Sequence, residues 1–250
     1  SVMKQVPFFV RLLEQYRQPM IGVGGILFPG VVLVMYDRLK NHEWEALAPL
    51  AWVMAYLAMF AVRLPVTYQH GRYAMPTAAV VIILGLDGMN QIFEWNADGV
   101  VKRLLSRTWS ISAAVVLAAF TVIGADAYAD DVAIIETEMV ATARWIDANT
   151  PRDALVAVHD IGAIAYYSNR DLVDLAGLVS PEVIPILRDE AALAQYITAK
   201  DVDYLVSFPS WYPELVQHAD LVFQTDTDYS VDAGGENMAV YRWSGDAFAH

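Results

Sequence analysis

The sequence contains no cysteine, so disulfide bonds and thiolate metal sites are excluded. Basic residues are also few, with 16 Lys and Arg against 29 Asp and Glu and a formal net charge of −13. Nucleic acid is therefore not expected as a partner, because its phosphates are bound by an excess of positive charge. The sequence has no phosphate loop of the Walker type and no G-x-S-x-G nucleophile motif. These absences exclude several common classes of nucleotide-binding and hydrolytic enzyme.

Charge is missing over four long stretches of the chain. A helix needs about 20 apolar residues to cross the hydrocarbon core of a membrane. The hydrophobic share is 56%, against about 45–50% in an ordinary soluble domain, and the mean hydropathy is +0.35. We therefore predict transmembrane spans over residues 18–36, 46–62, 73–93 (interrupted by Asp87) and 108–125.

The two halves of the chain differ in charge. Residues 1–125 carry 10 Lys and Arg and 7 Asp and Glu, a balance of +3, whereas residues 126–250 carry 6 and 22, a balance of −16. This asymmetry predicts a multi-span α-helical membrane region over 1–125, followed by a soluble acidic domain over 126–250. The chain opens with Ser1 and shows no signal-peptide pattern, so we expect a fragment of a longer protein.

The short loops give a first indication of membrane orientation. Loops 37–45 and 94–107 together hold five Lys and Arg, and 63–72 holds two. The positive-inside rule then places 63–72 and the acidic half outside the cytoplasm, in a multi-pass protein of the cell membrane. Adding the three basic residues of 1–17 gives five on each side, which leaves the orientation open.

From Asp126 onward, helical and strand patterns alternate. Asp130 or Asp131 can cap a helix that ends near Asn149, because Thr150-Pro151 follows. Strands alternating with helices predict a small α/β domain whose last two strands are antiparallel. The predicted strands are 154–158, 172–175, 204–208, 221–224 and 238–243. Residues 160–168 are expected to form a short helix or a turn, and 189–199 and 213–218 are expected to be helical.

The polar link 64–76, LPVTYQHGRYAMP, lies between two predicted spans. A guanidinium grips phosphate oxygens with two parallel hydrogen bonds at any physiological pH. An imidazole can add a further hydrogen bond or carry a proton, and aromatic rings can stack on a sugar. Alternatively, the arginine is a snorkelling flank and the tyrosines belong to the aromatic belt. The candidate substrate-binding residues are Tyr68, Gln69, His70, Arg72 and Tyr73.

A second candidate site follows the first predicted strand, because strand ends in α/β domains are common binding positions. A His-Asp pair there suggests a metal site or an acid–base dyad, but no second histidine lies at ligand spacing. The alternative is that the aspartate caps the next helix and that the glycine permits close packing. The candidate residues are His159, Asp160, Gly162, Tyr166 and Asp174.

An acidic loop near the end of the chain offers the one further cofactor hypothesis. Asp226, Asp228 and Asp232 could hold a divalent cation such as Ca²⁺, but their spacing differs from that of an EF-hand. A solvated loop is the favoured interpretation, so we expect no cofactor and no metal ligands.

Two segments resemble a known family. Residues 63–76, followed by an apolar run, resemble the late transmembrane region of GT-C-type glycosyltransferases, relatives of dolichyl-phosphate-mannose-type mannosyltransferases and the aminoarabinose transferase. In that family an Arg-Tyr-x-x-Pro element, here Arg72 to Pro76, often stands at the outer end of a span. Residues 141–181 resemble the extracytoplasmic C-terminal domain of bacterial membrane proteins of this kind.

The resemblance implies a polyprenyl-phosphate-linked sugar donor, transfer on the outer membrane face, and a glycan or protein acceptor. The family has many more spans, and its catalytic carboxylate lies in the first extracytoplasmic loop. Here the first loop, 37–45, falls on the cytoplasmic side of the expected topology, so no catalytic residue is expected in this chain. The alternative function is a non-catalytic, membrane-anchored extracytoplasmic binding or sensing domain.

Overall fold

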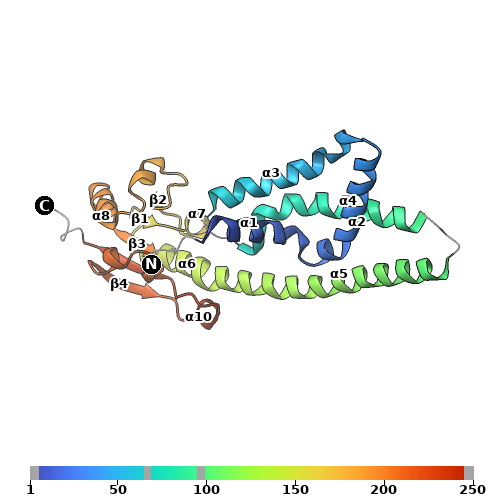
Figure 1. Cartoon of the computed structure of the whole chain (residues 1–250). Helices are drawn as coiled ribbons and strands as arrows, with labels where there is room; N and C mark the ends of the chain where they lie inside the picture. Colours follow the sequence, from blue (N-terminus) through green and yellow to red (C-terminus); the bar gives the residue numbers. More distant parts are fainter. Residues whose placement is uncertain (1–5, 65–68, 95–98, 245–250) are drawn as a thin grey trace. The chain divides into compact units, whose positions relative to one another are not determined.

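The structure is a computed structural model that describes residues 6–64, 69–94 and 99–244 (Figure 1). The chain divides into two compact units, Ser1–Gly124 and Ala125–His250. In the described residues the first unit is helical, and the second combines helices with a small mixed sheet. The chain therefore joins helices that are long and apolar enough to cross a membrane to a small α/β fold.

Three stretches of the described residues meet the length and hydropathy of a membrane span, namely Trp44–Arg63, Gly71–Phe93 and Arg103–Asn149. A bent pair of helices, discussed next, makes a fourth if it counts as one span. The elements of the first unit are α1 (Phe8–Arg17), η1 (Gln18–Met20), α2 (Val23–Lys40), η2 (Trp44–Leu47), α3 (Ala48–Arg63), η3 (Gln69–Ala74), α4 (Met75–Glu94) and most of α5 (Val100–Ile134).

The span predicted over 18–36 is not one continuous helix in the structure. The chain forms two helical segments, Phe8–Met20 and Val23–Lys40, that are bent by 94° relative to each other. Gly22 stands at the break with a φ of +69°, a conformation that glycine adopts without a steric penalty. The absence of charge over 18–36 indicated an apolar environment, but hydropathy carries no information about such a turn.

Glycines let α2 pass very close to α4, which it crosses in Figure 1. A Cβ added to Gly30 would lie 2.2 Å from the carbonyl oxygen of Gly85, and one added to Gly88 would lie 2.0 Å from the carbonyl oxygen of Gly30. Small residues permit this backbone approach between apolar helices. Nearby, Arg38 Nη2 lies 3.7 Å from Asp87 Oδ2, so the one acidic residue of the predicted third span has a cationic partner.

Helix α5 does not end at residue 125, where the fourth predicted span ends. It runs to Ile134 and continues through a π-helical segment, η4 (Ile135–Val140), into α6 (Ala141–Asn149). The helix start predicted at Asp130 or Asp131 is therefore wrong, because both residues lie inside α5. The predicted end near Asn149 is confirmed.

The second unit contains, in its described residues, one sheet of five strands in the order β2-β1-β3-β5-β4. β1 (Leu155–Val158) pairs in parallel with β2 (Asp171–Asp174) and with β3 (Tyr204–Ser207). β5 (Ala239–Trp243) pairs antiparallel with β3 and with β4 (Ala219–Gln224). The five predicted strands and the antiparallel pairing of the last two are confirmed.

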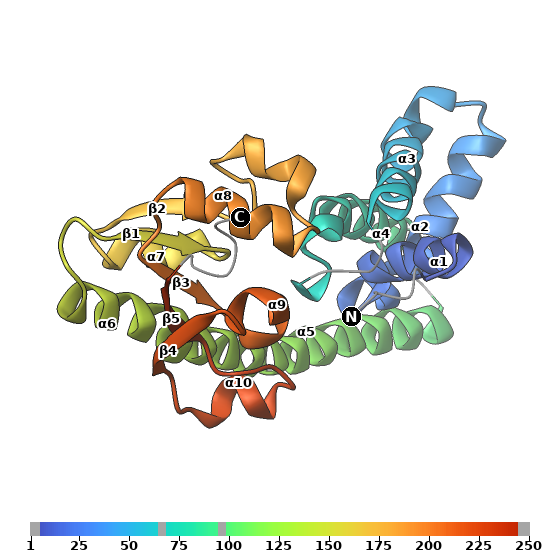
Figure 2. The same ribbon diagram turned by 90° about the vertical axis from the view of Figure 1, so that its left-hand side faces the viewer.

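Helices cover both faces of this sheet (Figure 2). One core contains residues of α6 and α7 (Ile161–Tyr167) together with Val156 and Val158 of β1. The other contains residues of α8 (Glu190–Ala199) and α9 (Pro213–Val216) together with Ala157. Alternate β1 side chains thus enter opposite cores, as the two-residue period of a strand requires. The remaining short elements are η5 (Pro181–Ile186), η6 (Pro209–Trp211) and α10 (Asp228–Asp232), the last within the segment expected to be a loop.

A buried carboxylate joins the π-helical segment to the edge of the sheet. Glu138 is fully buried. Its carboxylate oxygens accept hydrogen bonds from the hydroxyls of Thr225 and Thr227, from the Asn237 amide at 3.1 Å and from the Met238 N–H at 2.7 Å. Burying a carboxylate is costly unless its oxygens are satisfied in this way. Glu138 therefore anchors η4 to the β4–β5 hairpin.

Candidate functional site

The topology of the second unit singles out the gap between β1 and β3. The chain leaves β1 through α7 and returns in β2 on one side, and it leaves β3 through α9 and continues into β4 and β5 on the other side. In open α/β sheets, ligands bind outside the carboxyl ends of the strands at the point where the connections diverge. The residues that follow β1 and β3 are therefore the first candidates for a site.

His159 follows β1, and it meets Tyr212 of the segment that follows β3. The distance from His159 Nδ1 to the Tyr212 hydroxyl oxygen is 2.6 Å. Burial lowers the pKa of His159, opposed by the charges of Asp160 and Asp174. Burial also raises the pKa of Tyr212, helped by Glu190 and Asp174. Both side chains are therefore uncharged near neutral pH, and one donates its hydrogen to the other.

Trp211 places an exposed ring beside this pair. Its ring centroid is 4.6 Å from that of His159, with an edge-on angle of 72°, and 4.9 Å from that of Phe208. The indole remains 44% exposed. The turn η6 that presents it is held by a hydrogen bond from the Ser210 N–H to Glu236 Oε2 at 2.9 Å. The switch point thus combines an exposed aromatic residue with a polar His–Tyr pair.

Asp174 ends β2, paired in register with Val158. Its side chain is fully buried and accepts hydrogen bonds from the backbone N–H groups of Ala176 at 2.7 Å, Val179 at 2.6 Å and Ser180 at 3.4 Å. These contacts fix the loop after β2, because a carboxylate can satisfy several donors at once. Asp174 and His159 therefore share one edge of the sheet, and the carboxylate orders the backbone there.

The other residues predicted for this site have local roles. Asp160 caps α7, with its Oδ1 atom 3.4 Å from the Gly162 nitrogen, as the alternative interpretation expected. A Cβ added to Gly162 would meet only Asp160 Oδ1, at 3.7 Å, so packing does not require a glycine there. Tyr166 is 78% exposed and packs against Tyr167 near the end of α7. Their roles in ligand binding stay predictions.

Trp211 and Tyr212 were missed by the sequence reasoning. They follow the predicted strand 204–208 within a few residues, just as His159 follows the strand 154–158. His159 was selected because residues that follow a buried parallel strand often bind ligands. The same criterion, applied to the strand 204–208, would have selected Trp211 and Tyr212. The missing information was that β1 and β3 are neighbours, which depends on the order of strands in the sheet.

In the first unit, Arg72 and Tyr73 lie in η3, just before α4. Arg72 Nη2 donates a hydrogen bond to the Tyr73 hydroxyl at 3.0 Å, and its guanidinium carbon lies 4.9 Å from the centroid of the Tyr73 ring. Tyr73 in turn stacks on Phe60, with centroids 5.1 Å apart. Arg72 is exposed, and no ion pair to it occurs within residues 6–64, 69–94 and 99–244.

The remaining residues predicted for this link are only partly described. Tyr68 lies outside the described residues, and for Gln69 and His70 the backbone alone is described, within η3. Their contribution to a site stays a prediction.

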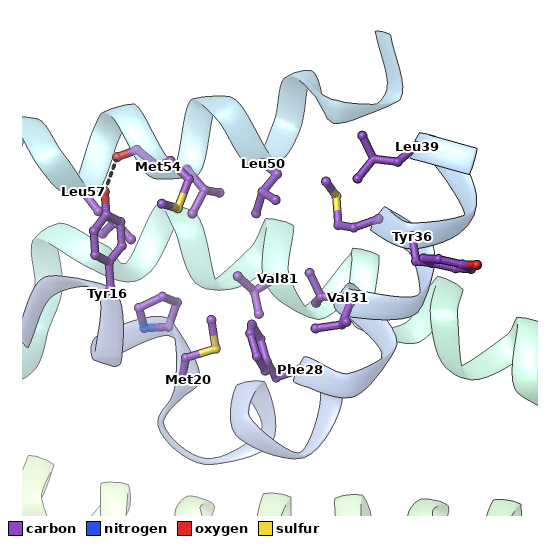
Figure 3. Close-up of a pocket in the computed structure, with 14 residues that line it drawn as sticks. Tyr16, Met20, Phe28, Val31, Tyr36, Leu39, Leu50, Met54, Leu57 and Val81 are labelled. Carbon is purple, nitrogen blue, oxygen red and sulfur yellow. Dashed lines mark hydrogen bonds between the residues drawn. The ribbon is translucent and has the colours of Figure 1, made fainter. Parts of the chain in front are cut away.

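An apolar cavity of about 550 Å³ lies in the first unit, chiefly between α2 and α3. Figure 3 shows side chains of the two helices facing each other across it, with Val81 of α4 at its base. The Tyr16 hydroxyl donates to the carbonyl oxygen of Met54 at 3.0 Å, which satisfies a polar group of the lining. The cavity is lined by Tyr16, Pro19, Met20, Phe28, Val31, Val32, Met35, Tyr36, Leu39, Leu50, Val53, Met54, Leu57 and Val81.

The turn that holds Arg72 lies against η1, two of whose residues line this cavity. Gly71 has a φ of +73°, and a Cβ there would lie 2.4 Å from Gln18 Oε1. Gln18 begins η1, whose Pro19 and Met20 line the cavity. The exposed Arg72 is therefore next in the sequence to Gly71, whose neighbour Gln18 directly precedes two residues of the cavity lining.

A family model described as Domain of unknown function (DUF8728) matches residues 103–241, more than half of the chain. The match covers nearly all of α5 and most of the second unit, including His159, Trp211 and Tyr212, and leaves out Arg72 and the apolar cavity. None of the curated proteins that were compared matches the chain. In the part of the chain that the structure describes, no three His, Cys, Asp or Glu residues are grouped so that they could hold a metal ion.

Proposed function

We propose that this chain, which belongs to the family of the Domain of unknown function (DUF8728), is the C-terminal part of a membrane glycosyltransferase that uses a polyprenyl-phosphate-linked sugar. The observation that carries the proposal is the apolar cavity lined in part by η1, the segment against which the turn of Arg72 lies. A lipid-linked sugar needs both an apolar surface for its chain and a cation for its phosphate. The resemblance of residues 63–76 to GT-C-type enzymes supports the same donor class.

Membrane insertion is supported by the exposure of the long helices. In the most apolar window of Arg103–Asn149, none of the residues is buried within the described structure, and in Trp44–Arg63 only 17% are buried. Each Å² of apolar surface left in water costs about 25 cal/mol. Lipid covers this surface in our proposal, and the acidic second unit lies outside the cytoplasm. The exposed apolar residues of α5 include Leu104, Leu105, Ile111, Val115, Leu117, Val122 and Ile123.

The cavity suits one lipid chain in both size and chemistry. Ligand pockets in proteins commonly measure about 300–1,000 Å³, and this one measures about 550 Å³. Its lining of Met, Leu, Val and aromatic side chains would bury an isoprenoid or acyl chain without leaving a polar group unpaired. Arg72 would bind the phosphate through its guanidinium nitrogens, and Tyr73 would hold that guanidinium in position.

Binding of polyprenyl phosphate to the full chain in phosphatidylcholine nanodiscs tests this proposal. Met54→Trp fills the cavity and should weaken binding of both polyprenyl phosphate and the matched polyprenol. Arg72→Ala should weaken binding of the phosphate alone, by about tenfold to a hundredfold, which is the worth of one charge-assisted hydrogen bond. Arg72→Lys should recover part of this loss because it restores the charge without the planar fork.

Two control variants make this result specific. Met59 lies on the same helix, is similarly exposed and does not line the cavity, so Met59→Trp should leave both affinities unchanged. Arg63→Ala removes another exposed cation at the end of α3 and should likewise have no effect. Equal affinity for phosphate and alcohol in the unaltered chain would rule out Arg72 as the phosphate contact.

Glycosyl transfer itself is tested by turnover of a radiolabelled polyprenyl-phosphate sugar in membranes that carry the full-length protein. Arg72→Ala should lower kcat/KM by about the factor by which it weakens phosphate binding and leave kcat unchanged, if the guanidinium contacts the phosphate equally in the ground and transition states. Absence of any turnover with intact lipid binding would favour the second candidate function below.

A membrane-anchored binding domain is that second candidate, and one observation favours it. At the switch point the polar groups are a neutral His–Tyr pair, and the nearby Asp174 already accepts three backbone hydrogen bonds. Such an arrangement can recognise a ligand without transforming it. The two functions differ in whether a lipid-linked sugar is consumed.

A further inference from the structure

We propose that the switch point between β1 and β3 is a binding site for a neutral saccharide, with Trp211 as the stacking platform and the His159–Tyr212 pair as the hydrogen-bonding group. Identifying this saccharide with the acceptor of the transfer reaction rests on the proposed function. The binding itself rests only on the geometry of the second unit.

The position is set by the fold. His159 and Tyr212 are 53 residues apart in the sequence, and they meet because β1 and β3 are parallel neighbours whose connections leave in opposite directions. Two loops therefore meet at one place on the sheet edge. This is where open α/β sheets bind small molecules.

The chemistry of the exposed groups points to a sugar. The Trp211 ring lies beside the rings of His159 and Phe208, and the residue stays 44% exposed. The negative face of an indole attracts the polarised C–H groups on one face of a pyranose. A neutral imidazole has two ring nitrogens, and Nδ1 is engaged with the Tyr212 hydroxyl. Its Nε2 atom is the second hydrogen-bonding position, and it suits a hydroxyl group, which both donates and accepts.

Charge selects against phosphorylated and acidic ligands. Carboxylates border the site on two elements, with Asp160 next to His159 and Glu236 bonded to the turn of Trp211. Glu190 accepts hydrogen bonds from the N–H groups of Glu214 and Leu215 in α9, directly after Tyr212. Residues 126–250 carry 22 acidic and 6 basic residues in all. An anion would be repelled here, whereas an uncharged sugar pays no such cost.

Saturation-transfer NMR on the full chain in phosphatidylcholine nanodiscs tests the site. Alkyl maltoside detergents are avoided because their sugar headgroup is itself a probe. The probes are methyl β-D-glucopyranoside, methyl α-D-mannopyranoside and glucuronate, each at millimolar concentration. We expect transfer to at least one methyl glycoside, strongest at ring C–H protons, and little transfer to glucuronate.

Matched variants assign that signal to the switch point. Trp211→Ala should weaken the affinity about fivefold to tenfold, as for the loss of one aromatic contact, and Trp211→Phe should recover part of it. His159→Ala should weaken it as well. Tyr229 is a comparably exposed aromatic residue on α10 of the same unit, and Tyr229→Ala should leave binding unchanged.

Two outcomes would overturn the proposal, namely no transfer to either methyl glycoside or a signal of equal strength in Trp211→Ala. Stronger transfer to glucuronate than to the methyl glycosides would also contradict it. These results are separate from the lipid-binding experiment. Loss of the Arg72 effect with retained glycoside binding would reject the lipid-phosphate donor but keep a saccharide-binding unit, and the reverse result would reject only the saccharide site.

Discussion

The two units of this chain handle apolar side chains in opposite ways. In Ala125–His250, apolar residues on the strands and helices are enclosed in two cores, one on each face of the sheet. In the described residues of Ser1–Gly124, the long helices keep many large apolar residues exposed, and their buried residues lie mainly where α2, α3 and α4 face one another, for example Leu27, Leu57 and Val81. The difference supports the proposal that lipid covers the first unit and water the second, because leaving apolar surface in water is costly.

The largest effect is expected from Glu138. Glu138→Ala would leave two hydroxyls, one amide and one backbone N–H of the second unit without their acceptor. Two of these donors, the Thr225 hydroxyl and the Met238 N–H, are buried, and each buried donor without an acceptor costs about 1–3 kcal/mol, so we expect a loss of about 2–6 kcal/mol. Hydrogen exchange of the β1 and β3 amides in the full chain measures it. Glu136→Ala, at an exposed site of the same π-helical segment, should change exchange little.

The next largest effect is expected when the same substitution, leucine to alanine, is made in each of the two units. Leu193 is fully buried in α8, whereas Leu117 is 58% exposed on α5. Leu193→Ala should destabilise the second unit by about 2–5 kcal/mol, because it removes buried methyl groups and leaves a cavity. Leu117→Ala should leave the same β-strand amides equally protected. Similar losses of protection in the two variants would contradict the division into differently solvated units.

A charge placed on α5 distinguishes lipid from water as its surroundings. Leu117 lies near the middle of the predicted span 108–125. Leu117→Lys should lower the efficiency of membrane insertion by the equivalent of about 2.5–3.5 kcal/mol. The efficiency of insertion can be measured by an assay with engineered glycosylation sites on either side of α5. Leu221→Lys, at an exposed position of β4, is the control, and equal effects at both positions would argue against a spanning α5.

The smallest effect concerns pH. Because burial lowers the pKa of His159 in the folded state, the unfolded chain binds more protons between the folded value and about 6.5. The stability that this histidine contributes is therefore present above about pH 6.5 and is lost as pH falls through the folded pKa. Titration of the His159 ring protons by NMR should give a midpoint below 6.5, and His159→Gln should weaken the acid-induced loss of β1 and β3 protection. A midpoint above 6.5 would contradict the burial argument.

Most helices and strands of the acidic unit could be predicted from its sequence, because the patterns that mark them extend over only a few residues. Asp160 caps α7 and Asp189 caps α8, both by hydrogen bonds within three residues, and short apolar runs between turns mark the strands. The apolar unit was read less accurately. Hydropathy located α3 and α4, but it could not show the break at Gly22 or the continuation of α5 beyond residue 125.

The candidate sites were also predicted only in part from the sequence. The sequence singled out His159 and Arg72 by residue type and position, and the structure gives each a neighbour that shapes it. For Arg72 that neighbour is adjacent in the sequence, since Tyr73 both accepts its hydrogen bond and lies under its guanidinium. For His159 the neighbours Trp211 and Tyr212 come from another strand end. The apolar cavity is formed by side chains from several helices, so the sequence of no single helix could predict it.

By itself the sequence determined the apolar stretches, the acidic second half and the order of its strands and helices, because periodicity, caps and charge act over a few residues. Only the tertiary structure decided which distant groups meet. The order β2-β1-β3 brings His159 to Tyr212, and the β4–β5 hairpin brings four donors to Glu138 from about 90–100 residues away. These contacts between distant residues depend on how whole helices and strands pack to bury their apolar faces, and no local sequence pattern predicts that packing.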